Sequence, residues 1–276
     1  VLGPEHPRIA YGQFNLALSY SYQGLYDKAM PLFFLAQKGQ ITEIQRESPY
    51  LLLKDRESFI KQFDYSYFKL FDLFSRGDSA IELALYARLN RHGLLEEIES
   101  RQAKLAKLEG PQQQIAEELK EVIQKLASTV LKDKERGDLI KRKEKLEKKL
   151  YRLLPQLEPR LVTLKEVAKS IPRNGILIEF QRYTAFDSAR STNEKDQENY
   201  LALVLNPNGE KSAINIGTSD IIDKKIIQAL QASEEGLADA QKLWKEVGDL
   251  VIKPLKEAIG DAETLFISPD AELNRV

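Results

Sequence analysis

The spacing of apolar residues changes once along the chain, and this change constrains the fold more than any other feature of the sequence. Over the first part, apolar side chains recur every three or four residues, which is the spacing of an amphipathic helix. Beyond Pro155 and Pro159, short continuous apolar runs at 175–180, 200–205 and 264–268 alternate with helical patterns. Runs of this kind are typical of buried strands in an α/β sheet. The sequence therefore predicts a mostly α-helical part followed by an α/β sheet domain.

The order of elements in the second part predicts a sheet that is incomplete. The runs 200–205 and 213–216 are separated by a short turn sequence and form a hairpin, and helices follow over 219–231 and about 236–259. The last run, 264–268, has three consecutive large apolar residues at its centre, which predicts burial on both faces between neighbouring strands. We therefore expect a further C-terminal half of this sheet, in the same gene product or as a separate chain.

The first part divides into three helical patterns. Residues 50–75 carry an aromatic stripe at near-helical spacing, which indicates the core of a divergent helical hairpin. Residues 79–154 are charged and leucine-rich and predict long amphipathic helices that pack as a hairpin or a short coiled coil. Breaks are expected at Gly110-Pro111 and within 132–138, a run that contains a glycine. The basic run 141–149 is interspersed with glutamates at helical spacing, so a solvated helix face is expected there.

Composition and charge exclude several classes of function. The 276 residues hold 41 Lys and Arg against 42 Asp and Glu, a balance that argues against a dedicated binder of nucleic acid or of a membrane surface. The chain has no cysteine and two distant histidines, His6 and His92, so no disulfide, thiolate metal site or cysteine nucleophile is expected within it. No phosphate-binding glycine motif occurs. We expect no metal, no cofactor, no membrane span and a cytoplasmic location.

Small and large residues alternate near the N-terminus in a pattern that resembles a tetratricopeptide repeat. Two antiparallel helices that pack closely need small residues where their axes approach and large residues in the flanking holes. The matching positions are Leu16, Ala17, Tyr20, Gly24, Tyr26, Ala29, Phe33 and Ala36. The preceding residues 2–7 resemble the linker between repeats of the kinesin-light-chain type. The resemblance implies that this helical region binds a protein or peptide partner.

Two segments of the second part resemble the CHAT family of caspase-like domains, which accompany tetratricopeptide repeats. Residues 263–274 are similar to the family's "strand, S/P-D-G-x-L-N" signature, with Ala271 in place of the usual glycine. Residues 177–187 are similar to the family's first strand and the loop after it. The charged helical segment between repeat and sheet also agrees with the family's order of elements. Arg275 and Val276 depart from the apolar continuation of the signature.

The resemblance implies a peptidase of the caspase and separase clan that uses a His–Cys dyad. In that family both catalytic residues follow strands that lie beyond the elements present here, and neither His6 nor His92 matches the catalytic position. We therefore expect no catalytic residue in this chain, which alone is inert. Residues after the strand ends are candidates for part of a substrate groove, with structural turn residues as the competing interpretation. These candidates are Arg182, Tyr183, Asp187, Asp270 and Asn274.

The sequence thus predicts three segments: a repeat over 1–47, divergent and long amphipathic helices over 48–158, and the N-terminal half of a CHAT domain over 159–276. The expected function is the regulatory and partner-binding portion of a caspase-like cysteine peptidase. The alternative is a non-catalytic interaction scaffold with a degenerate CHAT domain. A third interpretation, a regulator controlled by nucleic acid, rests only on the basic run 141–149.

Overall fold

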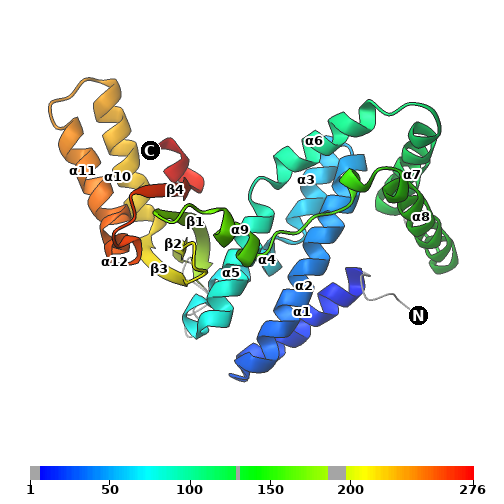
Figure 1. Ribbon diagram of the computed structural model, residues 1–276, viewed down its shortest axis with the longest axis horizontal. Helices are drawn as coiled ribbons and strands as arrows, with labels where there is room; N and C mark the ends of the chain where they lie inside the picture. Colours follow the sequence, from blue (N-terminus) through cyan, green and yellow to red (C-terminus); the bar gives the residue numbers. More distant parts are fainter. Residues whose placement is uncertain (1–6, 129–130, 186–196) are drawn as a thin grey trace. The chain divides into compact units, whose positions relative to one another are not determined.

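The computed structural model describes residues 7–128, 131–185 and 197–276 (Figure 1). The chain forms two compact units, each assembled from segments that are separated in the sequence. Unit 1 comprises 1–16, 35–64 and 90–161, and unit 2 comprises 17–34, 65–89 and 162–276. The division into segments 1–47, 48–158 and 159–276 stays a prediction.

The described part of the chain is helical up to the sheet, as predicted. Its helices are α1 (Pro7–Tyr22), α2 (Tyr26–Glu47), α3 (Leu53–Lys61), α4 (Asp64–Phe71), α5 (Asp78–Arg91), α6 (Leu94–Ala106), α7 (Gly110–Ser128), α8 (Asp133–Leu153) and α9 (Leu164–Ser170). Short 3₁₀ turns lie at η1 (Ser48–Tyr50), η2 (Phe74–Arg76) and η3 (Pro155–Leu157). Thr163 caps α9 through a reciprocal capping box with Glu166.

The helical turn between α1 and α2 lies where the repeat pattern places it. Gly24 has φ +75°, a left-handed conformation that glycine adopts without steric cost. Four of the small and large pattern residues are buried, namely Ala17, Ala29, Phe33 and Ala36. Gly39 allows α2 to approach α1, because a Cβ atom there would lie 2.9 Å from the Cβ of Ala10.

Other pattern residues lie on the surface. Leu16 is 47% exposed, so it does not fill a hole between the helices as the pattern predicts. Its face of α1 is not covered by other described residues, which is the physical reason for the difference. Residues 2–6 of the expected linker, His6 among them, lie outside the described residues.

In unit 1, α7 and α8 pack against each other as an antiparallel pair, which confirms the predicted hairpin (Figure 1). Their apolar faces share a core with η1 and η3, built around Leu119, Ile123 and Leu150. The predicted break at Gly110 is confirmed, with φ +64° where α7 begins. The predicted break over 132–138 is wrong in position. Helix α8 begins at Asp133 and runs through Gly137, because a single glycine costs a helix only about 1 kcal/mol.

The basic run 141–149 is only partly solvated, which corrects the expectation for this segment. Lys143 is mostly buried and forms an ion pair with Glu47 of α2, and Glu147 is buried beside it. Glu43 lies in the same cluster, and its Oε2 atom is buried without a hydrogen-bond partner. Burial raises the pKa of Glu43 to about 8, and the neighbouring charge of Glu47 adds to the shift.

Unit 2 contains a mixed four-stranded sheet. Its strands are β1 (Gly175–Ala185), β2 (Gln197–Leu205), β3 (Lys211–Thr218) and β4 (Thr264–Ser268). The order is β3-β2-β1-β4, with β4 parallel to β1 and the other neighbours antiparallel. The predicted hairpin and the predicted strands are confirmed, and so is the fold class of a mostly helical part followed by an α/β part. The predicted end of the first strand at 180 is wrong, because β1 continues to Ala185 alongside β2, so Arg182 and Tyr183 lie within the strand and not in a loop after it.

Helices α10 (Ser219–Glu234) and α11 (Ala240–Val251) pack on one face of this sheet (Figure 1). Alternate residues of β1, such as Ile176, Ile178 and Phe180, bury against them. The predicted single helix over 236–259 is wrong. Helix α11 ends at Val251, and η4 (Lys253–Leu255) and α12 (Lys256–Ile259) follow, because Pro254 cannot continue a helix.

Strand β4 is exposed, so the described elements do not supply the burial on both faces that its apolar run predicts. It stands at the edge of the sheet, beside β1 alone. Leu265 and Ile267 project to the face that α10 and α11 cover further along the sheet, and Phe266 projects to the other. All three side chains are more than a third exposed, and none of them belongs to the hydrophobic core that α10 and α11 form with the sheet.

No described helix is both long enough and apolar enough to cross a bilayer.

The buried Glu43 makes stability depend on pH. With its pKa near 8 in the folded chain and an ordinary value near 4.5 in the unfolded chain, the folded state holds an extra proton between these values. The stability from this group is therefore complete at low pH and is lost as pH rises toward 8. In the wild-type chain the free energy of unfolding should fall by on the order of 3 kcal/mol as pH rises between these two pKa values. Replacing Glu43 by Gln should abolish this fall, as measured by urea unfolding at several pH values.

The matched control is Glu121→Gln, at an exposed position of α7. It should leave the pH dependence of unfolding unchanged. An unaltered pH dependence in the Glu43 variant would show that the buried carboxyl does not hold its proton.

Candidate functional site

Strand β1 carries two polar side chains on the face opposite α10 and α11. Glu179 and Gln181 are two residues apart, so they point to the same side of the sheet. Both are almost completely buried, next to Leu203 and Leu201 of β2. Buried polar groups require partners, because an unpaired one costs about 1–3 kcal/mol.

Arg88 of α5 provides these partners and is itself only 4% exposed. Its Nε donates to the Glu179 carboxylate at 3.1 Å, and its Nη1 donates to Gln181 Oε1 at 3.3 Å. Its Nη2 donates to the backbone carbonyl of Pro269 at 2.9 Å. Tyr67 of α4 donates its hydroxyl to the same Gln181 oxygen at 2.7 Å.

Asp270 joins this cluster from the segment that follows β4. One carboxylate oxygen accepts from Gln181 Nε2 at 2.9 Å and from the backbone N–H of Arg182 at 2.8 Å. The other lies 3.7 Å from Arg88 Nη1. We call these five residues, Tyr67, Arg88, Glu179, Gln181 and Asp270, the Arg88 network. It ties two helices to the middle of β1 and to the segment that follows the carboxyl end of β4, the kind of place where open α/β sheets bind ligands.

The side chain of Arg182 points to the other face of the sheet. It pairs with Glu198 of β2, at 2.8 Å from its Nε, and with Asp223 of α10 at 3.3 Å. Tyr200 donates to Asp223 at 2.7 Å and accepts from the backbone N–H of Glu272 at 3.2 Å. This second cluster holds the segment after β4 from the α10 side.

The structure brings together only some of the groove candidates that the sequence predicts. Arg182 and Asp270 are brought together, through the Arg182 backbone. Tyr183 is buried beside Phe74, and burial raises its pKa to about 12, with a smaller contribution from Asp72. Asn274 donates to the carbonyl of Ala271 and so fixes its own turn. Asp187 lies outside the described residues.

Sequence reasoning missed Arg88, Tyr67 and the role of Gln181. A signal was present for part of the network, because two polar residues two apart interrupt an otherwise apolar strand. Arg88 lies in a helix near the buried residues Leu85 and Ala87. The sequence does not show which element the Arg88 side chain faces.

Ala271 has φ +49°, the one positive φ among the described residues other than glycine. This is the position where the CHAT-like pattern has glycine. A left-handed conformation costs a residue with a Cβ atom about 1–2 kcal/mol. The backbone geometry after β4 is therefore the one that glycine favours.

The arrangement supplies binding and positioning groups. It does not include the cysteine of a His–Cys dyad, since the chain has no cysteine. In the described part of the chain, no three His, Asp or Glu side chains gather as a metal site.

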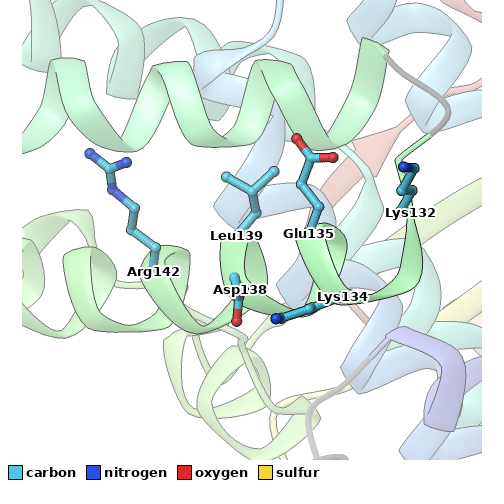
Figure 2. Close-up of a pocket in the computed structure, with 6 residues that line it drawn as sticks. All are labelled: Lys132, Lys134, Glu135, Asp138, Leu139 and Arg142. Carbon is cyan, nitrogen blue, oxygen red and sulfur yellow. The ribbon is translucent and has the colours of Figure 1, made fainter.

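A surface depression lies elsewhere, in unit 1, and is lined by Lys132, Lys134, Glu135, Asp138, Leu139 and Arg142. Figure 2 shows Glu135, Leu139 and Arg142 projecting from α8 toward the facing helix. Arg142 is paired with Glu118 of α7 at 2.6 Å, and the lining holds both positive and negative side chains.

In comparisons with known proteins, no family model, curated protein or solved structure matches this chain.

The left-handed Ala271 generates a stability prediction. Ala271→Gly should stabilise the chain by about 0.5–1 kcal/mol, because the relieved strain exceeds the backbone entropy that glycine adds to the unfolded state. Thermal or urea unfolding measures the difference.

Ala262→Gly is the matched control, since Ala262 lies in a loop and has no positive φ. It should lose up to about 1 kcal/mol. Equal losses in both variants would contradict the strain at Ala271.

Proposed function

We propose that the chain is the regulatory and partner-binding portion of a protein with tetratricopeptide repeats and a CHAT domain, a caspase-like cysteine peptidase. The observation that carries the proposal is the open edge of the sheet at β4. An apolar strand with Leu265, Phe266 and Ile267 exposed on both faces is directly followed by the CHAT-like residues 269–274.

The chemistry of this edge indicates what covers it. The N–H and C=O groups of β4 that point away from β1 need a neighbouring strand, and exposed edges of this kind promote aggregation. Because apolar residues are exposed on both faces, a single bound peptide strand is insufficient. The proposed occupant is the other half of a caspase-like domain, with a strand beside β4 and packing on each face.

In the proposed parent protein, that half supplies a cysteine and a histidine. The imidazole takes the thiol proton, the thiolate attacks the scissile carbonyl, and the same proton passes to the leaving amine. Water then releases the acyl group and restores the thiol. The helical region binds a protein or peptide partner, and the location is cytoplasmic.

The alternative is an interaction scaffold with a degenerate CHAT domain. Ala271 favours it, because the residue departs from the family's glycine while the backbone keeps the conformation that glycine requires. The parent reading frame separates the two functions. A histidine followed by a cysteine, each after a strand, whose Cys→Ala variant no longer cleaves a polypeptide, supports the peptidase. A parent without that cysteine leaves the scaffold.

The exposed edge at β4 generates a prediction about the pairing of the two halves. Both proposed functions require this pairing, but only the peptidase allows it to be measured as polypeptide cleavage. Ile267→Lys should leave the folding of the 276-residue chain nearly unchanged, because the side chain is 49% exposed. In the parent protein it should abolish polypeptide cleavage, since a buried lysine would stand between the two halves.

Ile221→Lys is the matched control, the same exchange at an exposed position of α10. It should keep both folding and cleavage. Full cleavage by the Ile267→Lys parent would refute the proposed pairing at β4.

A further inference from the structure

Helix α5 makes contacts on two opposite sides. The ring of Tyr86 lies 5.7 Å from the ring of Phe34 in α2, measured between centroids. Two positions later, Arg88 enters the network on β1 and the segment after β4. Residues two apart are about 200° apart around a helix of 3.6 residues per turn. One side of α5 therefore meets the repeat-like hairpin and the other meets the sheet.

A second connection runs in parallel with the first. The guanidinium of Arg76 lies 5.2 Å from the ring centroid of Tyr26, at the start of α2. Two residues earlier, Phe74 packs edge-on against Tyr183 of β1, with 6.4 Å between ring centroids. Both connections thus pass from residues 26–34 to β1 through the segment 74–88, and all of them lie within unit 2.

The geometry at Arg88 makes this connection sensitive to small movements. Its three donors reach a carboxylate, an amide oxygen and a backbone carbonyl at 2.9–3.3 Å. Helix shifts in regulated proteins are about 1–2 Å, which exceeds the tolerance of a hydrogen bond. A shift of α5 therefore breaks the fork: the Pro269 carbonyl loses its donor and Asp270 loses its ion pair with Arg88, which leaves Asp270 held to β1 by Gln181 and the Arg182 N–H alone.

We propose that α5 is a relay, in which Arg88 is the positioning residue that transmits the state of residues 26–34 of α2 to the segment 269–275 after β4. The relay is a property of this chain. Its role in controlling a peptidase rests on the proposed function.

Hydrogen exchange in the 276-residue chain tests the relay. Phe34→Leu removes the ring contact with Tyr86 but keeps an apolar side chain of similar size. It should raise exchange of the amides in 264–276 about threefold or more, while exchange in β2 and β3 stays unchanged. Leu35→Ala is the control, because its side chain is 51% exposed at the next position of α2.

The decisive comparison repeats Phe34→Leu in a chain that already carries Arg88→Lys, a substitution that keeps the charge but loses the planar guanidinium. There, exchange of 264–276 should already be raised, and adding Phe34→Leu should change it no further. A purely structural role of Arg88 predicts additive effects instead.

Additive effects, or faster exchange spread equally over the whole sheet, would overturn the relay. If Phe34→Leu unfolds, Tyr86→Leu takes its place; if Arg88→Lys unfolds, Arg88→Gln combined with Glu179→Gln takes its place, because this pair does not leave the Glu179 carboxylate buried without its cation. Failure here leaves the proposed function untouched, since that depends on the parent reading frame and its cleavage activity.

Discussion

The sheet of this protein depends on one buried cation. Arg88 is surrounded by Glu179, Gln181, the carbonyl of Pro269 and, at 3.7 Å, Asp270, and the Glu179 and Gln181 side chains are buried away from water and need donors. A buried charge is tolerated only when it is paired and hydrogen-bonded on all sides. The network therefore fixes where α5 lies on the sheet and where the chain goes after β4.

The two faces of the sheet are held by different physical means. On the α10 and α11 face, apolar residues such as Ile178 and Phe180 pack in a hydrophobic core. The other face combines leucines of β2 with the Arg88 network. An apolar core tolerates rearrangement, whereas a polar network accepts only one geometry, so the second face is the one suited to transmit a change of position.

Much of the fold follows from local sequence patterns. The helical part, the hairpin of β2 and β3, the α7–α8 pair and the turn at Gly24 are all set by short-range spacing and by turn residues. The apolar run of β4 predicts burial by neighbouring elements, but a local pattern does not reveal whether those elements are present, and the described part of the chain leaves the strand exposed. Lys143 and Glu43 were also missed, since a helix pattern does not show which element it meets.

The candidate site was predictable only at its strand ends. Asp270 was found because it follows an apolar strand, but Arg88 lies 182 positions earlier, and no local pattern connects the two. Equilibrium unfolding of Arg88→Met, alone and combined with Glu179→Leu, tests the central claim most directly. The single variant should lose about 3–5 kcal/mol by stranding the Glu179 carboxylate, and the double variant should recover most of it. A loss below about 1 kcal/mol in the single variant, as for a surface pair, would contradict the account.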